Sequence, residues 1–314
     1  MLLACLAWTA TAPAADFPTR PLKLIVPFPP GGLLDNVGRA LAPSLSAQLG
    51  QPVVVENRPG AAGMIGTDAA VKAAPDGHTV LFYGGVGFVV APLLSPGLTF
   101  DPLKDLAPVS LVCRGPSVLV AAPSFPARSV GELIALAKAE PGKLSYGTPG
   151  NGNPNHVAGE LFKSAAGIDL VHVPYKGAAF VITDVMAGHV PVGFVTLGAA
   201  MPHLRSGKLR ALAVTTAQRW DSAPELPTMG DAGLPQVHLV DWSGFFVPAR
   251  TPKAAVERLN EVVQRSLAAP ELRARLREQG LDAQGSSSAE LAAEIKSDVA
   301  RLGRVVREAR IRAD

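Results

Sequence analysis

Residues 22–35 read Leu22-Lys-Leu-Ile-Val-Pro-Phe-Pro-Pro-Gly-Gly-Leu-Leu-Asp35. A short apolar strand runs here into a Pro-Pro-Gly-Gly turn and then directly into a helix, which is predicted for about residues 34–49 and ends at Gly50. The first amides of a helix have no intrahelical partner and lie at the positive end of the helix dipole. This junction can therefore hold an anion without any cationic side chain.

A second junction of the same kind follows at residues 143–156, Lys143-Leu-Ser-Tyr-Gly-Thr-Pro-Gly-Asn-Gly-Asn-Pro-Asn-His156. Pro154 suits the first helical position, so Asn153 is the predicted N-cap and Asn155 is predicted to face the mouth of a cleft. No Lys or Arg occurs in residues 27–38 or 144–162. Each junction alone is also explained as an ordinary turn that needs glycine, but the two together predict an anion held between two lobes.

Size and composition favour a globular protein of two lobes. The chain has 314 residues, of which 48% are hydrophobic and 18% are charged. The net charge is only +3, and the basic residues are scattered among few aromatic residues. A nucleic-acid partner is therefore not expected.

Residues 1–15 contain no charged side chain and end in Ala12-Pro-Ala14, which is typical of an export signal with a small-residue cleavage site. They lack the basic start of such a signal, and a frayed tail is the alternative. Leu2-Leu-Ala-Cys5 also has the form of a lipoprotein box. Removal of the signal leaves Cys113 as the only cysteine, which excludes an intramolecular disulfide and a cysteine-based metal site.

Strand-like and helical segments alternate along the chain, which is typical of an α/β fold with parallel strands. Strands are expected at 22–26, 53–55, 79–83, 118–122, 144–146, 170–173, 190–195, 209–215 and 242–248. Helices are expected at 34–49, 64–74, 130–139, 154–166 and 178–187, with three more at the C-terminal end. Their predicted caps are Ser129, Thr251 and Ser287. The chain is predicted to cross between lobes near residues 116–118 and 241–245. The predicted domains are an export signal at 1–15, lobe 1 at 16–116 and 245–314, and lobe 2 at 117–244.

Signatures of catalysis and of cofactor binding are missing. The chain has no Gly-x-Ser-x-Gly, no His-Glu-x-x-His and no phosphate loop that ends in Gly-Lys-Ser or Gly-Lys-Thr. His156 and Glu160 lie one helical turn apart, but two ligands do not make a metal site. Asp35 has two interpretations, a structural partner of the helix dipole or an acceptor for an amine or hydroxyl of a ligand. We expect no catalytic residue, no cofactor and no metal.

Several motifs occur together in order along the chain. They are Ile25-Val-Pro-Phe-Pro-Pro-Gly-Gly32 with Asp35 and Arg39, Val55-Glu-Asn-Arg-Pro-Gly-Ala-Ala-Gly63, Pro75-Asp-Gly-His-Thr79, His172-Val-Pro-Tyr-Lys-Gly177, Gly207-Lys-Leu-Arg-Ala-Leu-Ala-Val214 and Leu226-Pro-Thr228. This set resembles the substrate-binding receptors of tripartite tricarboxylate transporters, the Bug family. The resemblance covers essentially the whole mature chain.

The resemblance implies an exported, two-lobed periplasmic-binding-protein (Venus-flytrap) fold with two chain crossings at the hinge. It implies a periplasmic, monomeric receptor whose partners are a small organic anion (a di- or tricarboxylate, an acidic amino acid or an aromatic acid) and the membrane subunits of the transporter. Carried over to this sequence, the ligand-binding residues are Phe28, Gly31, Gly32, Leu33, Leu34, Asp35, Gly84, Gly85, Thr148, Asn151, Asn153, Asn155, His156 and Thr196. The chain departs from the family pattern at Gly152-Asn-Pro-Asn155 and at Val195-Thr196, so the identity of the ligand stays open.

Two rival functions remain at this point. An orphan receptor would sense the same ligand and signal through a partner protein without a permease. An enzyme on the same scaffold would have to rely on Asp35, His156 and Lys176, among which no nucleophile and base pair is evident.

Overall fold

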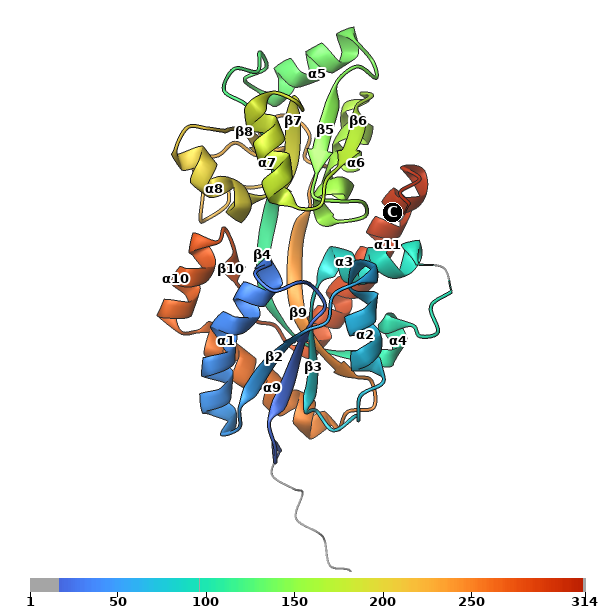
Figure 1. The fold of residues 1–314 in the computed structure, drawn as a ribbon, viewed down its shortest axis with the longest axis vertical. Helices are drawn as coiled ribbons and strands as arrows, with labels where there is room; N and C mark the ends of the chain where they lie inside the picture. Colours follow the sequence, from blue (N-terminus) through green and yellow to red (C-terminus); the bar gives the residue numbers. More distant parts are fainter. Residues whose placement is uncertain (1–16, 96, 313–314) are drawn as a thin grey trace, which may run out of the picture.

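The structure is a computed structural model that describes residues 17–95 and 97–312, so the predicted export signal at 1–15 lies outside the described residues. The described chain forms two lobes, one above the other, joined by strands that run from one to the other (Figure 1). None of the helices in this part of the chain has the length and hydrophobicity needed to span a bilayer.

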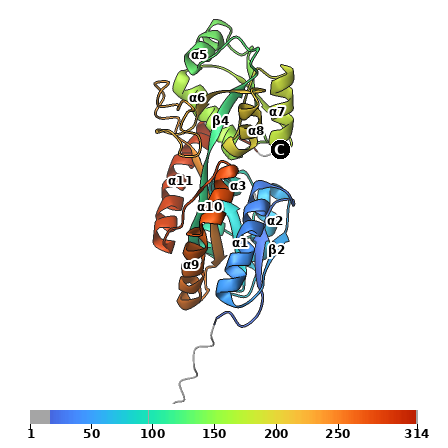
Figure 2. The ribbon, with the colours of Figure 1, turned by 90° about the vertical axis from the view of Figure 1, so that its left-hand side faces the viewer.

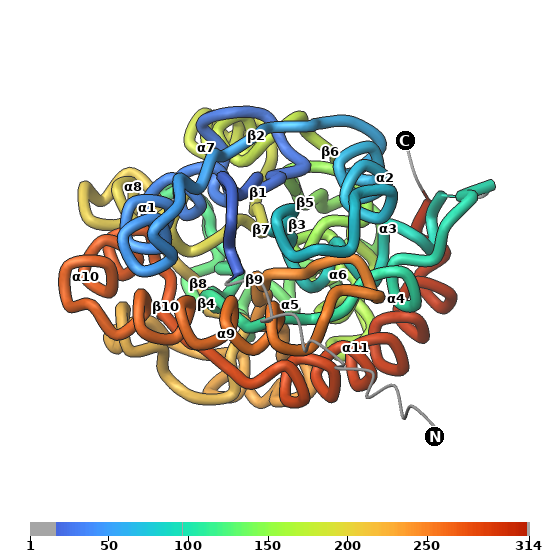
Figure 3. The backbone as a smooth tube through the Cα atoms, turned by 90° about the horizontal axis from the view of Figure 1, so that it is seen from below, coloured from blue at the N-terminus to red at the C-terminus, as the bar shows by residue number. Residues whose placement is uncertain are grey.

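The lower lobe is built on parallel strands that are extended by antiparallel ones. The parallel set is β1 (Leu22–Val26) between β2 (Val53–Asn57) and β3 (Thr79–Gly84). Next to β3 lie β9 (Val240–Pro248), β4 (Leu106–Ala121) and the short β10 (Asp282–Ala283), all antiparallel to their neighbours. The helices of this lobe are η1 (Ala61–Gly63), α1 (Leu33–Leu49), α2 (Met64–Val71), α3 (Gly85–Leu94), α4 (Pro102–Asp105), α9 (Lys253–Leu267), α10 (Pro270–Glu278) and α11 (Ser288–Glu308). Seen from below, α9 and α11 line one side of the molecule (Figure 3).

The upper lobe repeats the pattern of strands and covering helices. Its sheet contains β5 (Ser145–Thr148) between β6 (Val171–Pro174) and β7 (Val192–Thr196), all parallel, followed by the end of β4 and by β8 (Arg210–Val214). Its helices are α5 (Val130–Ala139), α6 (Pro154–Ala166), α7 (Ala178–Ala187) and α8 (Leu197–Arg205).

The long strand β4 joins the lobes because it changes partner in mid-course. Residues Leu106 to Pro116 pair with β9 in the lower sheet, and from Ser117 onward β4 pairs with β7 and β8 in the upper sheet. Together with β9, which starts at Val240, this gives two chain crossings. The predicted α/β, two-lobed fold with two crossings is confirmed. The change of partner supports the predicted limit at residues 116 and 117, while the domain limits as a whole stay a prediction.

Hydrophobic packing also ties the lobes together behind these strands. One core cluster combines Val90 of α3, Phe162 of α6 and Leu302 of α11, all fully buried. Figure 2 shows α11 rising along the lower lobe to reach α6. The C-terminal helix therefore braces one side of the hinge.

Three details differ from the sequence prediction. β4 begins twelve residues before the expected strand at 118, because the connecting segment pairs with β9. Helices α3 and α8, which start directly after β3 and β7, were not predicted. Thr251 is not a cap, since α9 has Pro252 at its N-cap position and no side-chain cap bond, whereas Ser129 and Ser287 do cap α5 and α11.

The lobes touch where α8 meets the end of α10. A Cβ atom on Gly198 of α8 would lie 1.9 Å from the carbonyl oxygen of Gln279, and one on Gly280 would lie 2.7 Å from the amide nitrogen of Gly198. Only glycine allows two backbones to approach so closely. This backbone contact therefore fixes the closest spacing of the lobes on that side.

We predict that Gly198→Ala lowers the free energy of unfolding by about 1–3 kcal/mol, because the added methyl group has no room beside the Gln279 carbonyl. Gly131→Ala is the control, since a Cβ on Gly131 in α5 meets only the Ser129 hydroxyl, at 3.9 Å, and alanine favours a helix. Thermal unfolding of both variants checks this. A Gly198→Ala protein as stable as the parent would show that the lobes do not hold this spacing in solution.

Candidate ligand-binding site

The first glycine loop is held by Asp35 from inside helix α1. Gly31, which has a φ of 81°, donates its N–H to Asp35 Oδ2 at 2.9 Å. Arg39 Nε donates to both Asp35 oxygens, at 2.9 and 3.0 Å, and Asn57 Nδ2 donates to Oδ1 at 2.9 Å. Burial alone would raise the pKa of this carboxyl, but the bonds from Arg39, Gly31 and Asn57 hold the pKa below its usual value. Asp35 is 2% exposed and fully engaged, which favours its structural interpretation.

Helix α1 itself starts without a side-chain cap. Gly32 is the N-cap residue and has no side chain to accept from the first amides. Leu33 is exposed and Leu34 is buried, while Phe28 in the loop stacks on Tyr83 with ring centroids 5.5 Å apart. The N-terminus of α1 is thus open to an acceptor from outside the helix.

Gly84 and Gly85 form a third junction, between β3 and α3. Gly84 is the N-cap residue of α3, and a Cβ on Gly85 would lie 2.1 Å from the ring of Trp242, so this position must be glycine. The Val86 N–H of α3 donates to Asp241 Oδ1 at 3.0 Å. An amide at this helix start is therefore already paired with a carboxyl group of the protein.

The second glycine loop uses its own side chains to satisfy its amides. Asn153 is the N-cap of α6, as predicted, and its Oδ1 accepts from the N–H groups of Asn155 at 2.9 Å and His156 at 3.0 Å. The Gly152 N–H donates to His156 Nδ1 at 3.0 Å. These donors of the loop are thus engaged within the loop.

The remaining polar residues of the second loop also point inward. Thr148 is fully buried, and its hydroxyl lies 3.0 Å from the Gly150 carbonyl oxygen and 2.7 Å from His172 Nε2. Asn155 is only 3% exposed, and its Oδ1 accepts from the Ser117 hydroxyl at 2.9 Å. The expectation that Asn155 faces the cleft mouth is wrong, because this side chain ties α6 to β4. Asn151 is partly exposed.

A small cavity lies between the lobes in front of the crossing strands. Its volume is about 30 Å³, and the residues that line it are Leu33, Cys113, Gly115, Pro116, Thr196, Leu197, Gly198, Asp241, Ser243, Gln279, Gly280 and Leu281. The start of α1 in the lower lobe and the start of α8 in the upper lobe both face it. Thr196 is the N-cap residue of α8, and its hydroxyl makes no cap bond. Two helix starts without side-chain caps therefore meet at one cavity.

Of the predicted site residues, only Leu33 and Thr196 line this cavity. The sequence prediction included Thr196 but missed the helix α8 that starts there, and it missed Asp241. Asp241 is partly exposed and belongs to the strand β9. Burial raises the pKa of Asp241 to about 7. The hydrogen bond from the Val86 N–H opposes this increase, and the charge of Asp298 adds to it. The sequence did contain a signal for Asp241. It is a charged residue directly before the apolar run 242–248, at a predicted lobe crossing.

Histidine side chains stabilise the second loop. His156 stacks on His172 with ring centroids 3.8 Å apart and lies 4.0 Å from Glu160. Burial, with a smaller contribution from Lys163, lowers the pKa of His156 to about 4. The ring is therefore neutral at pH 7 and can accept from Gly152. No group of three or more potential metal ligands occurs among the described residues.

We predict that acid selectively destabilises this loop. Because the folded-state pKa of His156 lies below its unfolded value, the stability that neutral His156 provides is complete above pH 6.5 and is lost as the pH falls towards 4. The His156→Asn variant keeps an acceptor near Gly152 but does not titrate. Between pH 7 and 4.5 its free energy of unfolding should fall by about 2–3 kcal/mol less than that of the parent. Urea unfolding at both pH values measures this, and equal losses would contradict it.

Comparisons with known proteins agree with this architecture. Residues 37–311 match the family model described as the tripartite tricarboxylate transporter family receptor. R. palustris Rpa4515, solved with adipate, is 35% identical, with a TM-score of 0.85 over 95% of this chain and 100% of that one. MatC from Rhodopseudomonas palustris, solved with malate, is 30% identical, with a TM-score of 0.81 over 92% and 100%.

The periplasmic binding protein BugD is 32% identical, with a TM-score of 0.81 over 95% of this chain and 100% of that one. All three proteins match this chain over nearly their full length, and BugD is described as a periplasmic binding protein. The family match covers most of the chain and includes both lobes and both crossings. The chain belongs to the Bug-type receptor family of the tripartite tricarboxylate transporters.

Proposed function

We propose that this protein is a periplasmic, monomeric receptor without catalytic activity that captures a small carboxylate between its lobes and delivers it to the membrane subunits of a tripartite tricarboxylate transporter. The ligand class is a di- or tricarboxylate, an acidic amino acid or an aromatic acid. The malate and adipate bound by MatC and Rpa4515 support a carboxylate ligand.

The observation that carries the proposal is the pair of uncapped helix starts at the cleft. The starts of α1 and α8 come from different lobes and line the same cavity, and neither has a side-chain cap. No Lys or Arg lines that cavity. A carboxylate placed there accepts from main-chain amides of both helices and is stabilised by both helix dipoles. We therefore assign the upper-lobe contact to α8 rather than to the second glycine loop.

Ligand entry requires the lobes to move apart. The cavity of about 30 Å³ is far smaller than the ~300–1,000 Å³ typical of ligand pockets. The backbone contact of Gly198 with Gln279 lies at the edge of this cavity. Opening at that contact, on the hinge formed by β4 and β9, would give access to both helix starts.

A sensor without a permease would use the same site, so the site alone does not distinguish a transport receptor from a sensor. Membrane subunits encoded beside this chain, and ligand uptake that is lost when either gene is deleted, would support delivery. Uptake that is unchanged without the receptor would favour the sensor. In both cases a thermal-shift screen against a carboxylic-acid library identifies the ligand, because a ligand at 100 times its Kd stabilises by about 2.7 kcal/mol.

We predict that Leu33→Pro weakens binding of the identified acid by about 1.5–3 kcal/mol, roughly 10- to 150-fold, because it removes one amide donor from the start of α1. Proline is tolerated at the first helical position, and Gly32 already has the extended conformation that precedes proline, with φ −73° and ψ 168°. Leu33→Ala is the control, since it shortens the side chain and keeps the N–H. Calorimetric titration that shows equal affinity for the two variants would remove α1 from the site.

We predict that the affinity for a ligand whose only polar groups are carboxylates falls about tenfold as the pH rises from 6.5 to 8.5. Asp241 faces the cavity, and ionisation of its carboxyl group near pH 7 places a negative charge beside the bound anion. The Asp241→Asn variant should bind with little pH dependence over this range. If the affinity of Asp241→Asn fell with pH as much as that of the parent protein, another group would control the pH dependence of binding.

A further inference from the structure

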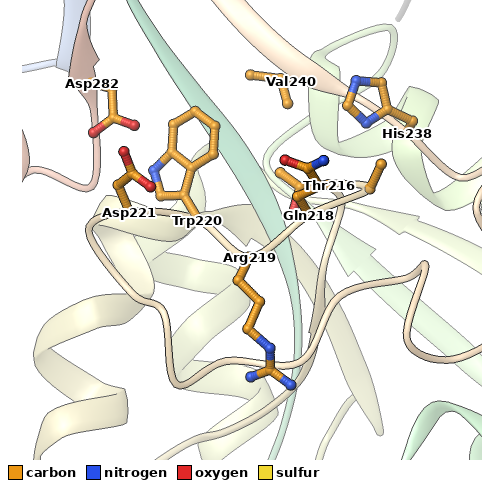
Figure 4. Close-up of a pocket in the computed structure, with 9 residues that line it drawn as sticks. Thr216, Gln218, Arg219, Trp220, Asp221, His238, Val240 and Asp282 are labelled. Atoms are coloured by element: carbon orange, nitrogen blue, oxygen red, sulfur yellow. The ribbon is translucent and has the colours of Figure 1, made fainter.

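Asp241 is the only charged residue among the described residues that line the cavity between the lobes. Successive side chains of a strand point to opposite faces, and Asp241 lies on the cleft face of β9. Its neighbour Val240 lies on the other face, where it borders the open groove beside residues 216–221 (Figure 4). Asp241 is also partly exposed. A ligand held in the cleft can therefore reach this residue.

Main-chain amides are the groups that donate to the Asp241 carboxyl group. The Val86 N–H, at the start of α3, donates to Oδ1 at 3.0 Å, and the Trp242 N–H also favours the charged form. No cationic side chain in the described part of the chain pairs with Asp241 within 4 Å. Arg114 opposes the rise in the pKa of Asp241 only partly, and its guanidinium group pairs with Glu294 at 3.0 and 2.6 Å. The protein therefore supplies no direct cationic partner for this carboxylate.

The groups around Asp241 leave it as the one that changes charge near pH 7. Burial, reinforced by the charge of Asp298 in α11, raises the pKa of Asp241 to about 7. Burial and the charge of Asp241 also raise the pKa of Cys113 to about 12 and the pKa of Tyr83 above its usual value, so both groups stay neutral. A cation beside Asp241 would lower its pKa and release a proton, whereas an anion would raise its pKa and take up a proton.

The cavity thus has two poles of opposite sign. The starts of α1 and α8 carry the positive ends of two helix dipoles and have no side-chain caps, so they favour a carboxylate. Asp241 carries the negative charge of the same cavity and favours a cation. An acid whose only polar groups are carboxylates satisfies the first pole and is repelled by the second. An acid that also carries an ammonium group satisfies both.

We propose that Asp241 determines the ligand specificity of this receptor by pairing with an ammonium group, so that the ligand is an acidic amino acid. This inference rests on the proposed function and narrows the ligand class given there. A carboxylate of the ligand accepts from the amides at the starts of α1 and α8, and its ammonium group donates to Asp241. A hydroxyl group could donate to Asp241 as well, but it would leave the negative charge without a partner. Ammonium is therefore the better match.

The test titrates the full mature chain by calorimetry at pH 7.5 with acids that differ only in one substituent. The first series is succinate, malate and aspartate, and the same three substituents are compared on the five-carbon and six-carbon diacids, with both enantiomers of each chiral acid. In the series that binds, we expect the amino acid to bind at least about tenfold more tightly than the plain diacid and more tightly than the hydroxy acid. These titrations use the unmodified protein, so they do not depend on the folding of any variant.

The outcomes separate this inference from the proposed function. A plain or hydroxy acid that binds as tightly as its amino counterpart would overturn the inference and leave the proposed function intact. The same conclusion follows if an acid of the wider carboxylic-acid library binds and no amino acid does. If none of these acids binds, the proposed function fails together with the inference.

Proton exchange on binding gives a second readout on the parent protein. Titrations at pH 7 in two buffers of different ionisation enthalpy count the protons that binding releases or takes up. Because Asp241 is about half protonated at this pH, we expect the amino acid to release up to about half a proton per site and a plain diacid to take up a similar fraction. Release of no proton by a bound amino acid would contradict the pairing of its ammonium group with Asp241.

A variant assigns the preference to Asp241 itself. Asp241→Asn keeps the shape of the side chain and an acceptor for the Val86 N–H, so it should weaken binding of the amino acid at least about tenfold while binding the plain diacid at least as tightly as the parent does. Glu257→Gln is the matched control, because it removes one negative charge from the exposed face of α9, where Glu257 pairs with Lys253, and should keep the preference. An equal loss for both acids in Asp241→Asn, or a lost preference in Glu257→Gln, would refute the assignment.

Discussion

The antiparallel pairing of β4 with β9 is the interaction on which the rest of the structure depends. β4 pairs with β9 up to Pro116 and with β7 from Ser117, so one strand belongs to both sheets. Side chains alternate along these strands and give the hinge two chemically different faces. Asp241 and Ser243 face the cleft, whereas Val240 lies on the opposite side, beside residues 216–221. A change of twist at this point therefore moves both faces together.

Helix α11 restricts how the crossing strands can move. Trp242 of β9 donates its indole N–H to Asp298 of α11 at 2.8 Å, and Arg301 also pairs with Asp298, at 2.7 Å. Arg114 of β4 forms a two-pronged ion pair with Glu294 of the same helix. Because α11 also packs on α6, the lobes are braced on that side, so the proposed opening would separate them on the side of the cleft. This asymmetry would give the proposed opening a preferred direction.

Much of the fold was predictable from the sequence, because the strands and long helices have clear periodicity and caps. The caps at Ser129, Asn153 and Ser287 follow from local hydrogen bonding and occur as predicted. A full capping box forms at Ser287, whereas at Ser129 the Glu132 carboxylate accepts from the Arg128 N–H in place of the Ser129 N–H. Helices α3 and α8 escaped prediction because each starts directly at the end of a strand, without a polar cap residue that bonds to its amides. The early part of β4 escaped because only its pairing with the distant β9 makes it a strand.

The site was harder to predict, because the sequence shows where glycine loops lie but not where their amides point. The two loops around Gly31 and Gly152 look equivalent in sequence. In the second loop, however, N–H groups donate to the side chains of Asn153 and His156. Asp241 comes from a strand 155 residues after the amide to which it bonds. Its place in the cleft is a property of the tertiary fold, and no local pattern specifies it.

The missing caps themselves explain how the proposed ligand could close the protein. An N-cap side chain contributes about 0.5–2 kcal/mol to a helix, and α1 and α8 lack that contribution within the protein. A carboxylate between their starts would act as a cap for both helices at once. Because the two helices belong to different lobes, each gains this stabilisation fully only when the lobes are close together. The bound carboxylate therefore stabilises the closed state more than the open state. The same amides that recognise the anion also favour closure of the lobes.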